Sequence, residues 1–569
     1  MSPRRVFLTG IAVCAIWGVK ATARKPQEPN QAAKTSLLYS AAVEIADEDV
    51  PKHRNGARRA VRVPRTQNIF QSVKLTLIVD ADGNVVSATP QKGPGDAYSD
   101  ALAEAKKWKY TPFEKEGKSI VAKITDYVRI LPPEDLPKTH QEFPGTQSTA
   151  GVVMTLSRSE CYGACPAYNL EIRGDGTLIY EGKGFVVVTG EHRDHLSAEQ
   201  VEALVAAFRK ADYFSLKDEY RYMVTDCPTY TTSFEVDRVK KSVTDYVGEE
   251  LGMPEAVTEL EETIDQVAGT GKWVNGNRET VTALKKEGWD FKSEEAAKTM
   301  ARAAGKGSSE FVQDLLKEGV RGSLEAESRN SALAAAAQAG DYRTLRMLIT
   351  AGVGRNDKQM KTSALGAAAF TGDLEMVREL IAYGADPKGV ALGEGGSSTV
   401  LMEAAASGVP DVAEAILAVH PDVNMSDEKG RTAVHYVSDG NDYWDRKRHA
   451  DRGQVIHMLA RAGADLDAQD DEGDTALHRA YYENVAKALI EEGADVNTRN
   501  NDGNTPLMEN FSVGVAQLLV AAGADVHLKN HEGKIALDLA RQLEPDGARV
   551  KFLLSVESAK AGHPQATSQ

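Results

Sequence analysis

Apolar and polar positions alternate most regularly between residues 73 and 130. Residues 73–79 (VKLTLIV) and 85–89 (VVSAT) have the pattern of strands, and the D-A-D-G-N sequence between them has the residue types of a tight turn. Apolar side chains then recur at helical spacing over residues 97–108, and residues 119–130 alternate again. This order predicts a small α+β domain with ββαβ topology over residues 69–131.

The sequence W-K-Y-T-P at residues 108–112 and Gly117-Lys118 stand between this helix and the last strand. Together with the strand, turn, strand and helix before them, they resemble the C-terminal domain of TonB-type energy transducers. The resemblance implies that an edge of the sheet can accept an extended partner peptide, a form of β-augmentation. We expect Trp108 and Tyr110 to be core residues.

A second α+β domain is expected over residues 151–274, after a Pro-rich linker at 132–150. Residues 169–182 alternate around a G-D-G turn as a hairpin, and a further strand pair follows at 230–236 and 241–247. Ser197 and Gln200 have the residue types and spacing of a capping box, which predicts a helix that begins after Ser197.

The stretch C-Y-G-A-C-P-A-Y at residues 161–168 characterises this second domain. With Thr225-Asp226, the L-E-x-x-I-D sequence at 260–265 and Trp273, it resembles a bacterial domain of unknown function found in exported proteins. The resemblance implies no activity, so the chemistry has to be inferred from the residues themselves.

Three cysteines follow residue 23, namely Cys161, Cys165 and Cys227. The first two differ in spacing from a thioredoxin-like C-x-x-C, and a zinc site usually needs four ligands, whereas His192 and His195 are distant in sequence. In an oxidising compartment we expect a Cys161–Cys165 disulfide. Cys227 is then a free thiol or the true partner of one of the other two, and we expect no metal or cofactor.

Residues 275–560 repeat with a period near 33, visible in a Thr or Ser followed two positions later by Leu or Val. The anchors are Ser331, Ser363, Thr399, Thr432, Thr475 and Thr505. With His435 and His478 in the T-x-L-H position and with recurrent G-A-D ends of helices, these residues resemble ankyrin repeats. The resemblance implies an all-α solenoid with β-hairpin loops, which binds proteins on its concave face and hairpins.

One repeat carries an insertion of roughly ten residues near its helix turn, since 31 residues separate Thr432 from Gly463, against 21 from Ser331 to Gly352. The insert holds four residues of types common at binding hot spots: Tyr443, Trp444, Arg446 and Arg448. Two interpretations stay open, namely that these residues contact a partner, or that Trp444 packs the loop back onto the array.

The chain begins with the pattern of an export signal. Arg4 and Arg5 precede an uncharged, mostly apolar run at residues 6–19, and A-T-A at 21–23 has the form of a cleavage site, so we expect a signal peptide over residues 1–23. Either an ordinary secretory signal or a twin-arginine signal fits. The run is too short for a permanent span, which predicts no transmembrane segment in the mature chain.

Charge completes this picture. The formal net charge is −16, yet residues 1–68 are basic, and we expect a basic linker at 24–68 and a disordered tail at 561–569. An acidic chain is a poor match for nucleic acid. The multi-domain pattern therefore predicts a periplasmic or secreted, non-catalytic scaffold for protein partners. The alternative is a cell-envelope thiol, redox or other enzyme whose chemistry lies in residues 151–274, with Asp226, Cys227 and the two histidines available for it.

Overall fold

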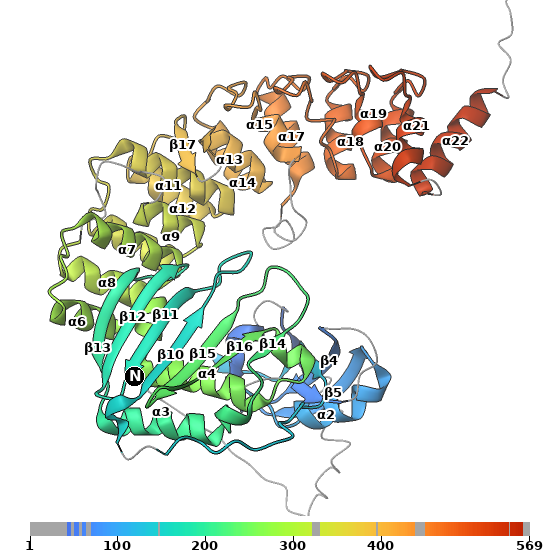
Figure 1. The fold of residues 1–569 in the computed structure, drawn as a ribbon. Coiled ribbons are helices and arrows are strands. Elements are labelled where there is room, and N and C mark those ends of the chain that lie inside the picture. The colour runs from blue at the N-terminus through green and yellow to red at the C-terminus, as the bar shows by residue number, and fades with distance from the viewer. Residues whose placement is uncertain are drawn as a thin grey trace, which may run out of the picture. The chain divides into compact units, whose positions relative to one another are not determined.

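The computed structural model describes residues 42–561, apart from 47–49, 56–59, 64–69, 116, 146–147, 321–330, 394–395, 439–449 and 545–546 (Figure 1). The expected signal peptide and most of the expected tail therefore lie outside the described residues. The chain forms two compact units, one of residues 1–138 with 220–222 and 247–255, and one of the remaining residues.

The first unit is built on a five-stranded sheet. Strands β4 and β5 form an antiparallel hairpin, and β9 pairs antiparallel with the other side of β4. The order β4, β5, α2, β9 is the expected ββαβ. The elements are β1 Val43–Glu44, η1 Val50–His53, β2 Arg54–Asn55, β3 Ala60–Arg62, β4 Ser72–Val79, β5 Val85–Lys92, η2 Gly95–Ala97, α2 Tyr98–Ala105, β6 Lys109–Tyr110, β7 Glu114–Lys115, β8 Lys118–Ser119 and β9 Ala122–Leu131.

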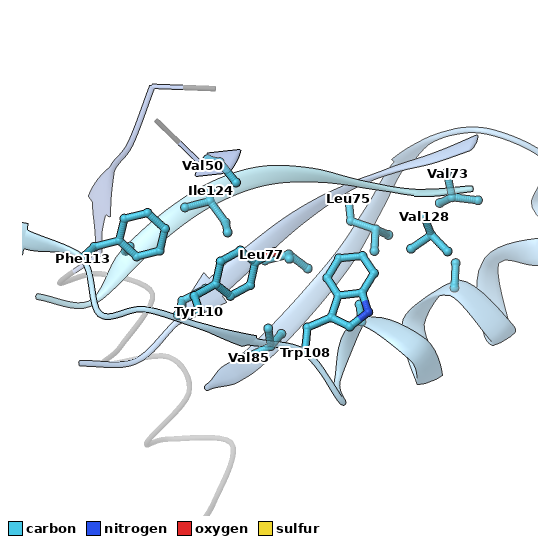
Figure 2. Close-up of a cluster of buried hydrophobic side chains, with 14 of the residues drawn as sticks. Val50, Val73, Leu75, Leu77, Val85, Trp108, Tyr110, Phe113, Ile124 and Val128 are labelled. Carbon is cyan, nitrogen blue, oxygen red and sulfur yellow. The ribbon is translucent and has the colours of Figure 1, made fainter. Parts of the chain in front are cut away.

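The core of this unit lies between the sheet and α2 (Figure 2). Leu75 and Leu77 of β4 and Ile124 of β9 alternate inward, as the period of two requires. Trp108 and Tyr110, which come from the W-K-Y-T-P sequence, are both buried in this cluster. They are core residues, as expected.

Part of the segment for which the sequence predicts a linker belongs to this sheet. β1 and β3 each pair parallel with β9, through Val43 beside Ala122 and Arg62 beside Leu131. Apolar residues of the segment, such as Val61, pack against the core, which gives these short strands a reason to form. The chain's own strands therefore occupy both ends of the outer edge of β9.

Between β1 and β3 the chain leaves the edge and places Arg54 over Asp126. Asp126 is fully buried, and Arg54 bonds to both carboxylate oxygens, at 2.5 and 3.1 Å. The hydroxyl of Tyr110 donates to the same carboxylate at 2.7 Å. A buried carboxylate requires such partners, so Arg54 is part of the folded domain.

The second unit begins with an antiparallel sheet in which β13, β12, β11, β10, β15 and β16 follow one another. Helices α3 and α4 lie on one face of it (Figure 1), and Phe208 of α3 packs on Phe234 of β15. Ser197 and Gln200 form the expected capping box. The elements are η3 Thr149–Gly151, β10 Val153–Arg158, β11 Ala167–Arg173, β12 Thr177–Gly184, β13 Gly190–His195, α3 Ala198–Lys210, η4 Tyr213–Ser215, β15 Tyr230–Val236, β16 Val239–Tyr246, α4 Glu255–Ala268 and α5 Gly271–Val274. Of the intervening elements, η5 Gly248–Leu251 and residues 220–221 of β14 Glu219–Arg221 belong to the first unit.

A stack of helix pairs follows in the same unit (Figure 1). Small residues of successive inner helices pack closely, as an ankyrin-like array requires, for example Ala336 and Ala368. The elements are α6 Arg278–Lys286, α7 Glu294–Gly305, α8 Ser309–Lys317, α9 Ala332–Gln338, α10 Tyr342–Thr350, α11 Lys358–Thr371, α12 Leu374–Ala382, β17 Val390–Gly393, β18 Gly396–Thr399, α13 Val400–Ser407, α14 Pro410–Leu417, α15 Ala433–Ser438, α17 Arg452–Arg461, α18 Glu483–Glu491, α19 Pro506–Glu509, α20 Val513–Ala521, α21 Ala536–Leu543 and α22 Ala548–Ala561.

Polar contacts join the array to the sheet of the same unit. Arg302 of α7 donates through Nε to the carbonyl oxygen of Val187 at 2.8 Å, and Glu295 of the same helix accepts from the hydroxyl of Thr189 at 3.0 Å. Glu287, just after α6, bonds to β13. The first helices of the array are thus docked on the β12–β13 end of the sheet.

Candidate functional site

The cysteine loop lies at one end of the second unit's sheet. Cys161 and Cys165, between β10 and β11, form a disulfide with a Cα–Cα distance of 5.6 Å, and Cys227 is a partly buried free thiol. This is the pairing that the sequence analysis favours. The side chain of Tyr162, inside the loop, is 88% exposed, so the loop faces solvent.

A polar cluster beneath this loop ties three strands to α4. Arg158, at the end of β10, donates to the hydroxyls of Tyr168 and Tyr230 at 3.0 and 2.6 Å. The hydroxyl of Tyr168 in turn donates to Asp265 at 2.5 Å, and Arg158 lies 3.4 Å from the same carboxylate. Thr270 adds a third donor to Asp265 at 3.0 Å.

The electrostatics of the cluster follow from its burial. Burial raises the pKa of Asp265, while the hydrogen bond from Tyr168 and the charge of Arg158 act in the opposite direction. Burial also raises the pKa of Tyr168, so its hydroxyl keeps its proton and remains a donor. The Tyr of C-x-G-x-C-P-x-Y and the Asp of L-E-x-x-I-D, far apart in sequence, are therefore direct partners that fix the base of the cysteine loop.

The two histidines that a thiol enzyme could use as a base do not lie near Cys227. His192 lies on β13, four strands away from β15, which at ~4.8 Å per strand is about 19 Å from the strand that follows Cys227. Its ring already bonds to Glu287 and to the carbonyl oxygen of Thr189. His195 is on the same remote strand, and Asp226 accepts a bond from the hydroxyl of Thr225. Cys227 consequently has neither histidine as a base.

In the array, His435 and His478 join successive repeats as their motif position implies. Nδ1 of each ring accepts from a threonine N–H, that of Thr432 or Thr475, at 3.1 Å. Nε2 donates to the next repeat, at 3.0 Å to the carbonyl oxygen of Asp474 for His435 and at 3.1 Å to that of Asn504 for His478.

Backbone hydrogen bonds join each hairpin tip to the next, and the side chain of Asn501 adds a bond to the carbonyl oxygen of Asp471 at 2.8 Å. The N–H of Asp471 donates to the carbonyl oxygen of Lys429, that of Asn501 to Glu472 and that of His531 to Asp502, at 3.0, 3.1 and 2.9 Å. These bonds hold four consecutive tips in one row, which we call the tip row; it comprises residues 427–430, 470–473, 500–503 and 530–533. The exposed acidic side chains of the row are Glu428, Asp471, Glu472, Asp502 and Glu532.

Two exposed aromatic residues stand at the same place in consecutive repeats. Tyr481, before α18, is 60% exposed, and Phe511, before α20, is 53% exposed. They are 30 residues apart, the local repeat length. They are not among the residues that the sequence pattern singled out, although two aromatic residues separated by one repeat length indicate such a pair.

The predicted contact residues Tyr443, Trp444, Arg446 and Arg448 lie outside the described residues. Their insert joins α15 to α17, which is the turn between the two helices of its repeat. Tyr481 and Phe511 occupy the corresponding turn in the next two repeats.

Comparison with family models identifies two parts of the chain. Residues 152–268 match the domain of unknown function DUF6438, and residues 300–391, 365–444 and 448–530 match the model for three copies of ankyrin repeats. No curated protein matches the chain. The chain therefore contains a DUF6438 domain followed by ankyrin repeats, a family of protein-interaction modules.

Among the residues that the structure describes, no helix combines the length and the apolar character needed to cross a bilayer. Within the same ranges, His, Cys, Asp and Glu side chains do not gather in groups of three or more suited to a metal ion.

Proposed function

We propose that this protein is an exported, non-catalytic scaffold that holds partner proteins on its ankyrin array. Ankyrin repeats offer an extended surface with protruding hairpins, which suits protein binding better than small-molecule chemistry. The observation that carries the proposal is the aromatic pair Tyr481 and Phe511, exposed at equivalent positions of adjacent repeats.

The guanidinium of Arg549 lies 5.8 Å from the ring centroid of Phe511, yet more than half of Phe511 and of Tyr481 stays exposed. Neighbouring core positions of their repeats, such as Leu489 and Leu519, are fully buried, so the repeats bury large side chains where packing needs them. A large aromatic left in solvent gains free energy when a partner covers it, and aromatic residues dominate binding hot spots. Tyr443 and Trp444, in the sequence between α15 and α17 of the preceding repeat, are further contact candidates in this proposal.

The tip row gives the partner a chemical character. The exposed side chains of the tip row include five acidic residues and one lysine, Lys429. Such a surface attracts a basic protein surface and speeds its approach. We therefore propose a partner with a basic face and an apolar patch.

Export is part of the proposal. The apolar run at residues 6–19 with its basic flank and A-T-A sequence supports a cleaved signal. The Cys161–Cys165 disulfide supports an oxidising compartment, in the periplasm or outside the cell. An extended peptide partner for the TonB-like domain would pair with β5 or displace β1 and β3, because these two strands occupy the ends of the β9 edge.

Crosslinked capture from the envelope fraction of the native host tests the scaffold. The full mature chain is used, because the array is hydrogen-bonded to the sheet domain. We expect Y481S/F511S and Y443S/W444S each to lower the yield of crosslinked partner at least tenfold, with unchanged far-UV circular dichroism. Val239→Ser, an exposed apolar residue of the β15–β16 hairpin, is the control and should retain the wild-type yield. Capture of no protein by the wild-type chain would contradict the proposal.

A further inference from the structure

The three described cysteines lie at the same end of three neighbouring strands. Cys161 follows β10, Cys165 precedes β11 and Cys227 precedes β15. In the sheet β10 lies between β11 and β15 and is antiparallel to both. Cys161 is therefore the central cysteine, with Cys165 on one side and Cys227 on the other.

The strand register brings the loops of Cys161 and Cys227 together. Arg158 faces Tyr230, and one step further the N–H of Ser159 donates to the carbonyl oxygen of Thr229 at 3.0 Å. The N–H of Thr229 returns a bond to the hydroxyl of Ser159 at 2.9 Å. Cys161 and Cys227 each lie two residues beyond this pair, in the loops that follow β10 and precede β15.

The surroundings of these cysteines leave them open to reaction. All three are only partly buried, and the loops that carry them hold Tyr162 and Met223, which are 88% and 96% exposed. Asp226, directly before Cys227, has a φ of 68°, in the left-handed region that aspartate adopts more readily than most residues. The N–H of Cys227 donates to the hydroxyl of Tyr246, which anchors this loop to β16.

The existing disulfide is also poorly suited to a purely structural task. It joins residues four apart in sequence and so closes a very short loop. A link of that length constrains the unfolded chain much less than one between Cys161 and Cys227 would. The ends of β10 and β11 are already held by their ladder and by the Arg158–Tyr168–Asp265 cluster.

We propose that Cys227 and the Cys161–Cys165 disulfide form a thiol–disulfide exchange site. The thiolate of Cys227 attacks Sγ of Cys161, the Cys161–Cys227 bond forms, and Cys165 leaves as a thiolate that takes up the proton lost by Cys227. One disulfide and one thiol exist before and after, so the step consumes no oxidant or reductant. The reactive thiol moves from the loop before β15 to the loop beside Tyr162, where it meets thiols and disulfides from solution.

Disulfide mapping of the full-length wild-type protein tests the exchange directly. The protein is held at pH 8 with a trace of reduced glutathione, quenched with acid, alkylated with N-ethylmaleimide under mildly acidic conditions, digested and analysed by mass spectrometry. We expect two isomers, Cys161–Cys165 with alkylated Cys227 and Cys161–Cys227 with alkylated Cys165. Detection of the first isomer alone would overturn the proposal.

Two matched variants test the central position of Cys161. After mild oxidation, C165S should form the Cys161–Cys227 disulfide, whereas C161S should form the Cys165–Cys227 disulfide at least tenfold less. Circular dichroism checks that both variants fold, and the wild-type map decides the matter if either does not. Equal yields, or a higher yield in C161S, would contradict the proposed geometry.

Discussion

Glu287 bonds to His192 across the junction between the ankyrin array and the sheet domain. Its Oε2 lies 2.8 Å from Nδ1 of His192, and its Oε1 accepts from the N–H of Arg193 at 2.5 Å. His192 is buried and stacks on Trp273, with 4.9 Å between ring centroids. One carboxylate that follows α6 thus fixes both the backbone and a side chain of β13.

Glu287→Ala should loosen this junction. It leaves a ring nitrogen of His192 and the N–H of Arg193 without their acceptor, at a cost of about 1 to 3 kcal/mol. Hydrogen exchange should show faster exchange at residues 190–195 and in α6. Glu279→Ala, an exposed acid on the same helix, should change neither the exchange rates nor the unfolding free energy. Equal effects of the two substitutions would mean that the junction does not depend on this carboxylate.

Arg54→Met should destabilise the sheet domain of the first unit, although Arg54 lies in the segment expected to be a linker. It removes a charged partner of the buried carboxylate of Asp126, for which a loss of about 3 kcal/mol in the free energy of unfolding is expected, measured by urea denaturation. Adding Asp126→Asn should recover at least half of the loss. Lys123→Met, which breaks the exposed pair with Glu44, should cost less than about 1 kcal/mol.

His478 should make the array less stable in acid. Burial lowers the pKa of His478, and its Nδ1 accepts a hydrogen bond that only the deprotonated nitrogen can accept. As the pH falls through the ordinary histidine value of about 6.5, the unfolded chain takes up a proton that the folded chain resists, so stability falls. The loss of Tm between pH 7.5 and 5.5 should be smaller in His478→Gln than in wild type. His527→Gln, at an exposed position, should retain the wild-type loss.

Tyr168→Phe should weaken the base of the cysteine loop. It removes the hydroxyl that connects Asp265 to Arg158, and one such bond to a charged group is worth about 1.5 to 3 kcal/mol. Tyr162→Phe, in the same motif but in solvent, should leave the free energy of unfolding unchanged. Chemical denaturation of both variants measures the difference, and equal stabilities would show that the cluster does not hold the strands.

The sequence was most informative where local pattern decides structure. The helix after Ser197, the ββαβ order and the imidazole positions of His435 and His478 follow from spacing alone, because caps and amphipathic faces are set within a few residues. In the repeat motif, the threonine and the histidine three residues later are the two partners of one hydrogen bond, so the motif itself identifies this bond.

Long-range pairings were not accessible in the same way. Nothing in the composition of the basic segment shows that Arg54 will meet Asp126, 72 residues away. The nearness of the loops that hold Cys161 and Cys227 depends on the pairing of β10 with β15, which side-chain packing across the whole sheet sets. Both relationships are set by the tertiary fold. The sequence therefore identifies the residues but does not show which of them lie close together.

The row of hairpin tips bears on how such a protein can change over generations. Its bonds from Asp471 to Lys429, from Asn501 to Glu472 and from His531 to Asp502 use main-chain atoms, so they are indifferent to the side chains at those positions. An exposed tip residue such as Asp502 can therefore change, and a whole repeat can be duplicated or lost, while each tip still meets its neighbour. The residues that close the turns, such as Asn500 and Gly503, do not have this freedom, because the Asn500 side chain accepts the N–H of Asn504 and Gly503 has a φ of 76°. New binding specificities can therefore arise on this surface without redesign of the framework that supports it.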